Sequence, residues 1–413
     1  MRDFLTEDTK AINLLCGVFS KDCSEKPLSL KEYSSLVRWL IQMKMRPSDL
    51  LEKDNIHQAS IGSGIDRKRL ESLLGRGVQL GFAVEEWQRN GIWIISRSDS
   101  DYPARYKKHL KDKAPPLLFG IGNRSLLKGG GLSIVGSRDV DQAGVAFTRK
   151  VAELCAYNRM PVISGGAKGV DQIAMTTAVE AGGVAIGVLA DNLLRRSLER
   201  SARQAIADGR LLLMSPYHPN ARFTVGAAMG RNKLIYAMSE YGLVVSAEHE
   251  KGGTWTGAEE ELRRENSLPV FVRTGDDVPQ GNIKLLDLGA ISWPNSPDRN
   301  NLKEQLESLS INRTKSQPQK NLSLFDLQPE PKIDISEELL PTTETKCPAS
   351  IYEAVLPIIL DKLDTPATAE ELAKKLEVNK TQLNDWLKKA VEEKKIAKLS
   401  KPVRYRKTET GAP

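Results

Sequence analysis

The chain has 413 residues, enough for two to four domains that each bury a core. Its 60 basic and 53 acidic residues give a net charge of +7, and a pI near 9.0 favours an acidic partner such as nucleic acid. Four dispersed cysteines argue against a zinc site or disulfide framework, and no apolar run approaches the roughly 20 residues that cross a bilayer, so we expect a cytoplasmic protein without a membrane segment.

Residues 1–90 show helical periodicity and contain no β-rich run, as in LSLKEYSSLVRWLIQM and DRKRLESLLGRGVQLGF. We therefore predict a small helical domain. Residues 91–123 contain a short apolar strand, the turn sequence DSDYP and a second strand after Pro115 and Pro116. We interpret this segment as a connector that leads into the main domain, which extends to residue 300.

The pattern changes between Leu132 and about Trp293, where helix-length stretches separate short apolar runs. These runs are LSIV, PVIS, VAIGVLA, LLLM, GLVVSA and PVFV. Strands that are apolar throughout are buried on both faces, which requires helices on each side of a parallel sheet. The predicted fold class is α/β, with a Rossmann-like, doubly wound and mostly parallel sheet.

The composition shifts again after residue 300. Residues 301–346 are rich in Ser, Gln, Pro, Lys, Glu and Thr, so we predict a flexible linker there. Helical periodicity returns in residues 347–413, which have the layout of helix, turn, helix and basic hairpin. This layout predicts a C-terminal winged helix, a module that binds either duplex DNA or another protein.

Three glycine-containing segments follow strands of the predicted sheet. The first, SIVGSRD, places Gly136, Ser137 and Arg138 between a strand and a helix, where backbone amides and a helix N-terminus bind anions. Arg138 is able to add a bidentate phosphate contact. By itself this segment leaves a second interpretation open, in which Gly136 serves only the backbone of the turn.

The second segment, VISGGAKGVDQIAM, also follows an apolar strand. Its composition suits a loop that wraps a phosphate, through Ser164, Gly165, Gly166, Lys168 and Gly169. The spacing matches neither a Walker loop nor a dinucleotide fingerprint. Asp171, at the start of the next helix, is more typical of a helix cap or dipole partner than of a catalytic base.

The third segment covers residues 229–262. Arg231, Asn232 and Lys233 precede a short helix and a strand in this prediction, and a further glycine-rich turn, formed by Lys251, Gly252, Gly253 and Thr254, follows the strand. Parallel strands end at the same edge of a sheet, so we expect the three segments to converge on one anionic ligand.

These motifs resemble those of the DNA-processing protein A (DprA/Smf) family. Its members share a Gly-Ser/Thr-Arg turn, a Ser-Gly-x-Ala-x-Gly-Ile/Val-Asp loop, an Arg-Asn-Arg-like segment and a Ser-Gly-Ser/Gly-Thr turn. The corresponding stretches here are GSR (136–138), SGGAKGVD (164–171), GRNKLIYAMS (230–239) and EKGGTWTGA (250–258). The upstream SDSDYPARYKKHLKDKAPPLLFGIGN is similar to the family's segment before its Rossmann-like domain, so the resemblance spans roughly residues 91–293.

The resemblance implies single-stranded DNA binding without catalysis or cofactor, and loading of the RecA recombinase onto that DNA in transformation or recombination. It also implies that the N-terminal helices are a SAM-like domain and that the chain forms a homodimer. Carried over to this sequence, the DNA phosphates lie at the three segments described above, with Arg138, Ser164, Gly165, Lys168, Arg231, Asn232 and Lys233 as the main contacts and Lys251 as a further candidate.

The sequence departs from the family pattern at three places. Met175 stands where the family usually has His, Lys233 where it has a second Arg, and Val272-Arg273-Thr274-Gly275 where it has Val-Pro-Gly. Arg273 and Lys168 are further candidates for phosphate contacts, or else solvated surface charges.

Two alternatives from other functional classes remain open. GGTWTGAEE (252–260) and Arg231 also resemble the nucleotide site of the lonely-guy phosphoribohydrolases, with Glu259 as the acidic residue. A sequence-specific transcription factor would instead use the winged helix and leave the three segments unexplained. In the linker, Leu322, Leu324 and Phe325 resemble a peptide that binds the bacterial sliding clamp, or else they pack back on a domain.

Overall fold

The computed structural model describes residues 5–19, 25–316, 356, 359–361, 363, 366–376, 380–393, 395–399 and 404–407. The chain divides into two compact units, Met1–Asn321 and Leu322–Pro413, which are described separately here. Within the described residues, no helix has the length and apolar character needed to cross a membrane.

The N-terminal part of the first unit is helical, as predicted. Its elements are α1 (Glu7–Cys16), α2 (Leu30–Gln42), η1 (Pro47–Leu51), α3 (Lys53–Ser63), α4 (Arg67–Leu74) and α5 (Gly77–Arg89). Ser29 and Glu32 form a capping box at the start of α2, which satisfies free backbone amides of its first turn. Trp87 on α5 packs edge-on against Phe119, with ring centroids 5.1 Å apart, so the helices share a core with the sheet.

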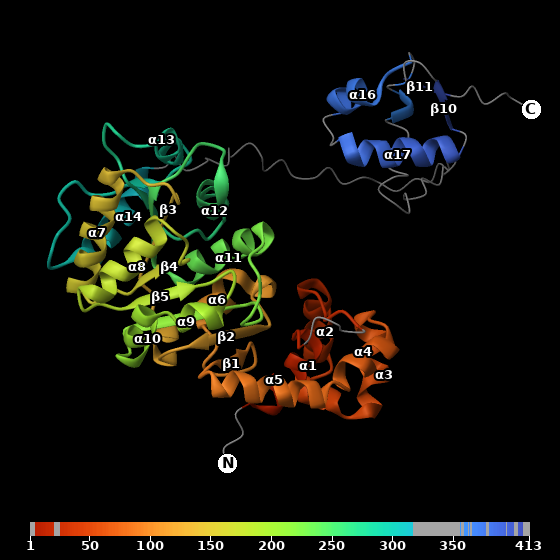
Figure 1. Cartoon of the computed structure of the whole chain (residues 1–413), viewed down its shortest axis with the longest axis horizontal. Helices are drawn as coiled ribbons and strands as arrows, with labels where there is room; N and C mark the ends of the chain where they lie inside the picture. The colour runs from red at the N-terminus through yellow and green to blue at the C-terminus, as the bar shows by residue number, and fades with distance from the viewer. Residues whose placement is uncertain are drawn as a thin grey trace, which may run out of the picture. The chain divides into compact units, whose positions relative to one another are not determined.

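A nine-stranded sheet forms the centre of the unit (Figure 1). Its strands are β1 (Trp93–Ser96), β2 (Leu117–Ile121), β3 (Leu132–Gly136), β4 (Val162–Ser164), β5 (Ala185–Val188), β6 (Leu211–Ser215), β7 (Tyr241–Ser246), β8 (Val270–Val272) and β9 (Ile291–Ser292). Their order is β1-β2-β6-β5-β4-β3-β7-β8-β9. Strands β3 to β9 are parallel, which confirms the predicted doubly wound, mostly parallel sheet.

Residues 91–123 are more than the predicted connector. They supply β1 and β2, and β2 pairs antiparallel with β6, so this segment extends the sheet at one edge. The two strands are buried along nearly their whole length. Their apolar residues therefore belong to the core of the main domain. The sequence pattern places the strands of this sheet only from Leu132 onward.

Helices cover both faces of the sheet. One face carries α6 (Ala104–Leu110), α11 (Val225–Met238), α12 (Gly252–Leu262) and α13 (Gln280–Asp287). The other carries α7 (Gln142–Tyr157), α8 (Val170–Glu180), α9 (Leu193–Ser197), α10 (Arg200–Ala207) and α14 (Leu302–Ser316). Short 3-10 helices η2 (Lys111–Lys113) and η3 (Arg124–Lys128) flank β2. Alternate residues of one strand serve the two layers: Ile134 packs with α7 and α8, and Val135 packs with α11 and α12.

The predicted linker at 301–346 begins too early. Residues 302–316 form α14, and Leu302 and Leu306 are fully buried in a cluster with Trp293. The two leucines lie one helical turn apart, so a single helix face reaches the core although the average composition is polar. Residues 317–346 lie outside the described part of the chain.

The C-terminal unit contains α16 (Ala369–Leu376), α17 (Lys380–Glu392), β10 (Ile396–Leu399) and β11 (Arg404–Lys407). The two strands pair antiparallel, and Ala367 bridges to Tyr405. Leu372, Leu383 and Leu387 form a core of their own with Ile396. Two helices followed by a hairpin is the predicted order of elements, and the identification as a winged helix stays a prediction.

Candidate functional site

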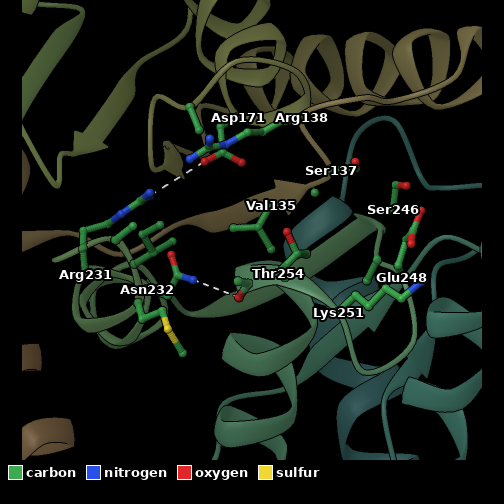
Figure 2. A pocket seen from close by; sticks show the side chains of 18 of the residues that line it. Val135, Ser137, Arg138, Asp171, Arg231, Asn232, Ser246, Glu248, Lys251 and Thr254 are labelled. Atoms are coloured by element: carbon green, nitrogen blue, oxygen red, sulfur yellow. Dashed lines mark hydrogen bonds and ion pairs between the residues drawn. The ribbon is translucent and has the colours of Figure 1, made fainter. Parts of the chain in front are cut away.

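A pocket of about 450 Å³ opens at the carboxyl ends of β3 and β7. Figure 2 shows side chains around it from the turn after β3, the start of α8, the middle of α11, the end of β7 and the start of α12. The predicted site residues that line it are Gly136, Ser137, Arg138, Arg231, Asn232, Lys251, Gly252, Gly253 and Thr254. The second segment adds Ala167 and Asp171, so parts of all three segments meet at this edge of the parallel sheet.

Glycines bring the first two segments into contact. A Cβ atom on Gly136 would lie 2.5 Å from Val170, and one on Gly169 would lie 2.4 Å from the carbonyl oxygen of Ser137. Gly169 also has φ of +88°, a conformation that favours glycine. The loop after β4 is thereby packed against the turn after β3, which fixes where α8 begins.

Most residues of the loop after β4 pack against the residues around the pocket and do not line it. The hydroxyl of Ser164 is buried and donates to the carbonyl oxygen of Ile134 at 2.6 Å, so it faces the sheet rather than a ligand. A Cβ on Gly165 would overlap the Arg231 guanidinium, and Gly166 has φ of +66°. Ser164, Gly165, Gly166 and Gly169 thus have structural roles in the loop, and their direct contact with phosphate stays a prediction.

Arg231 and Asp171 form a buried ion pair at the wall of the pocket, 3.7 Å between Nη1 and Oδ2 (Figure 2). Burial raises the pKa of Asp171, and Arg231 together with the amide of Gly165 partly offsets the rise. Burial also lowers the pKa of Arg231, with Asp171 acting in the opposite direction. Because the two charges largely cancel, the pair orders the loop and adds little net positive charge to the pocket.

Arg231, Asn232 and Lys233 lie within α11 instead of preceding a helix as predicted. The helix begins about two turns earlier, where the Thr224 hydroxyl accepts from the amide of Ala227. Helical spacing then separates the three side chains. Arg231 is buried beside Asp171, and Asn232 donates to the carbonyl oxygen of Gly253 at 2.9 Å. Lys233 pairs with Glu260 at 2.7 Å and does not line the pocket.

The N-terminus of α12 faces the pocket without a side-chain cap. Lys251 occupies the N-cap position, where Ser, Thr, Asp or Asn normally accept from free amides. Gly252, Gly253 and Thr254 form the first turn, whose amides have no acceptor within the helix. Free amides, the helix dipole and a lysine at the cap together favour an anionic ligand.

The rim of the pocket combines cations with exposed apolar groups. Arg138 is exposed and stacks on Phe223, its Cζ 5.3 Å from the ring centroid. Phe223 is 45% exposed, and Met229 is exposed to the same degree. The acidic side chain of Glu248 also lines the pocket, beside Lys251 in Figure 2. Phe223 was absent from the sequence prediction because its exposure depends on the irregular segment before α11.

Further cations lie beside the pocket at the next strand ends. Lys168 is exposed on the loop after β4 but is not among the pocket residues. Arg196 on α9 donates to the carbonyl oxygen of Gly166, and Arg195 beside it is exposed. Both arginines are absent from the sequence-based site, since α9 comes next to this loop only through the order of β4 and β5. Arg273 is buried, paired with Asp141 at 3.4 Å, and is not a surface contact.

The two remaining predictions concern the phosphoribohydrolase alternative and the clamp-binding peptide. Glu259, the acidic residue of the phosphoribohydrolase alternative, pairs with Arg263 at 2.8 Å one turn along α12 and does not line the pocket. Leu322, Leu324 and Phe325 lie outside the described residues. The interpretation as a clamp-binding peptide therefore stays a prediction.

The matches to known proteins cover the part of the chain that contains the pocket. The family model described as DNA recombination-mediator protein A matches residues 93–299. A DNA processing protein DprA from Bacillus subtilis is 29% identical over 49% of this chain and 69% of its own length. A protein Smf from Synechocystis is 27% identical over 55% of this chain and 58% of its own. The X-ray structure of DNA processing protein A from Streptococcus pneumoniae superposes with a TM-score of 0.54 at 22% identity, covering 69% of this chain and 94% of that one, which supports a shared fold.

Proposed function

Because the chain belongs to the DNA recombination-mediator protein A family, we propose that it binds single-stranded DNA in the pocket between β3, α11 and α12. The main support for this proposal is that Arg138, Lys251 and the uncapped N-terminus of α12 converge on one open pocket. Fixed amides and flexible cations hold a sugar-phosphate backbone and need not read a base.

The rim of the pocket supports a single strand over a duplex. Phe223 offers an exposed ring beside Arg138, and an unpaired base has a free face that stacks on such a ring. Lys168, Arg195 and Arg196 continue the positive surface past the loop after β4. A strand that leaves the pocket in that direction meets cations at the next two strand ends.

We further propose that the protein acts without catalysis, delivering the bound strand to the RecA recombinase during recombination or transformation. The family's description as a recombination mediator supports this role. A RecA strand-exchange reaction on DNA coated with single-strand binding protein would test it: we expect faster exchange when this protein is added, and an unchanged rate would overturn the delivery role. Homodimerisation and contact of the winged helix with DNA or protein are proposals of the same kind.

Binding of fluorescent oligo-dT at two salt concentrations tests the central proposal. Arg138→Ala removes an exposed cation from the rim, so we expect several-fold weaker binding and a salt slope lower by about 0.7 for each lost phosphate contact. Arg149→Ala, an exposed arginine on α7 outside the pocket, is the matched control. If Arg138→Ala and Lys251→Ala both bind like the wild type, this pocket is not the DNA site. Release of free base from a nucleoside monophosphate would favour the hydrolase alternative instead.

A further inference from the structure

A second positive surface lies away from the pocket, on α6 and η2. Residues 107–113 carry four exposed lysines: Lys107, Lys108, Lys111 and Lys113. None of these lysines forms an ion pair with any residue that the structure describes. Asp112 is the acidic residue among them, and its side chain is exposed as well. Lys107 lies over the ring of Tyr102, its Nζ 5.6 Å from the centroid, which leaves its charge in place. The surface therefore keeps a net positive charge that no ion pair among the described residues neutralises.

Helix α2 contributes to the same surface from far away in the sequence. The hydroxyl of Ser34 donates to the carbonyl oxygen of Asp112 at 3.0 Å, so α2 lies against η2. Lys31 and Arg38, both exposed, flank Ser34 one turn away on either side and so share its helix face. The Arg38 guanidinium donates to the carbonyl oxygen of Ser34 at 3.3 Å, which holds it close to this contact. We call these six cations, Lys31, Arg38, Lys107, Lys108, Lys111 and Lys113, the basic seam.

Other charges around α6 reinforce the positive sign. Arg264, just after α12, donates to the backbone carbonyl of His109, and Arg105 lies on α6 together with His109. Burial lowers the pKa of His109, and the nearby positive charges of Arg264, Arg105 and Lys108 lower it further. The acidic partners on this side, Glu240 and Glu261, are already paired with Arg105 and Arg264.

We propose that the basic seam binds the sugar-phosphate backbone of a nucleic-acid strand that continues out of the pocket. This inference rests on the proposed function and adds a second, sequence-independent contact to it. Exposed lysines on flexible stems make phosphate contacts that carry no sequence information. The aromatic side chains packed beneath the seam, Tyr33, Tyr102 and Tyr106, are buried, so bases have no stacking platform among them.

The fold places the basic seam within reach of a strand held in the pocket. Helix α6 packs against α11, the helix that carries Arg231 in the pocket wall. Arg105 on α6 donates to the carbonyl oxygen of Ser239, the C-cap of α11, at 3.2 Å. Arg231 and Ser239 are eight residues apart in sequence, which corresponds to about 12 Å along a helix axis. Both surfaces are in the same compact unit.

The test compares short and long oligo-dT binding to the full chain. We propose the variant Lys107→Gln, Lys108→Gln, Lys111→Gln and Lys113→Gln, which removes four charges from exposed positions. The matched control is Lys53→Gln, Lys68→Gln, Arg149→Gln and Lys150→Gln, four exposed cations elsewhere that form no ion pair within the described residues. Equal Tm values for both variants and the wild type would show that the fold is intact.

We expect the seam variant to bind the shortest oligonucleotides like the wild type and long ones about tenfold more weakly at low salt. The salt slope on long strands is expected to fall by about 2 to 3, because each lost phosphate contact on a single strand contributes about 0.7. The control variant should retain the wild-type slope on long strands.

The outcomes separate this inference from the proposed function. A seam variant with wild-type affinity and salt slope on long strands overturns the inference, whereas Arg138→Ala without effect on short strands overturns the pocket proposal. A seam variant that loses binding to polyglutamate but keeps its DNA binding would also overturn it, and would assign the surface to an acidic polypeptide instead.

Discussion

The pair of Arg231 and Asp171 shows that residue type alone does not tell whether a charged pocket residue serves the fold or a ligand. Both residues are nearly fully buried, at 6% relative exposure each. The buried guanidinium needs its carboxylate partner for the stability of the fold, because an unpaired buried charge costs several kcal/mol. Gly165 adds to the constraint, since any Cβ there would displace the guanidinium.

Asp171→Asn should therefore destabilise the protein by about 3 to 5 kcal/mol, because it leaves the buried Arg231 without a counter-charge. Urea unfolding measures the change in the free energy of unfolding. Arg231→Met in the Asp171→Asn background removes the orphaned charge and should cost less than the sum of the single variants. Additive losses, or a loss below about 1 kcal/mol for Asp171→Asn, would show that the two side chains are not coupled.

At the scale of elements, the contacts at helix ends decide much of the local stability. Glu32 in the first turn of α2 accepts from the amide of Ser29 at 2.7 Å and pairs with Arg69 of α4 at 2.5 Å. The hydrogen bond from Arg69, followed by that from Ser29, lowers the pKa of Glu32 to about 2. One carboxylate thus joins a helix cap to a contact between two helices.

The lowered pKa of Glu32 gives its contribution a defined pH range. A carboxyl with a lower pKa in the folded state stabilises that state above its ordinary pKa of about 4.5 and loses this effect as pH falls towards 2. Glu32→Gln should therefore flatten the decline of Tm between pH 4.5 and 2, when compared with the wild type. Glu86→Gln, an exposed carboxyl on α5 without an ion pair in the described chain, serves as control. Parallel curves for Glu32→Gln and the wild type would contradict the assignment.

The elements also differ in how well the sequence predicts them. The six apolar runs from LSIV to PVFV all became strands, because buried parallel strands need apolar residues on both faces. Helix α14 was missed because its buried face is marked by a few leucines within a polar stretch: Leu302, Leu306 and the partly buried Leu309. The start of α11 was missed because Thr224 is its only local signal, ahead of a segment rich in Gly and Ala.

At the scale of the whole molecule, the two units have separate cores. The cluster around Leu372 and Leu387 contains residues of the C-terminal unit alone, and the three clusters of the first unit contain none of these. The pocket and the basic seam both lie in the first unit. Nothing in its described core requires the second unit.

A fragment of residues 1–321 should therefore fold by itself and unfold at the same Tm as the corresponding transition of the full chain. Differential scanning calorimetry of both proteins measures this. We also expect the fragment to bind a short oligo-dT with the affinity of the full chain, since the pocket residues are all present. A Tm lower by more than about 5 °C would show that the second unit stabilises the first.

Local sequence alone determined the α/β class, the six central strands and the glycine-containing segments after them, because apolar runs and glycine turns act over a few residues. Only the tertiary structure decided how each segment is used: Ser164 bonds to a neighbouring strand, Arg231 is buried beside Asp171, and Phe223 reaches the rim. It also brought α2 against η2, through Ser34 and Asp112, which are 78 residues apart in the chain, to form the basic seam. Burial and charge pairing depend on neighbours from distant segments, and periodicity within one segment carries no record of them.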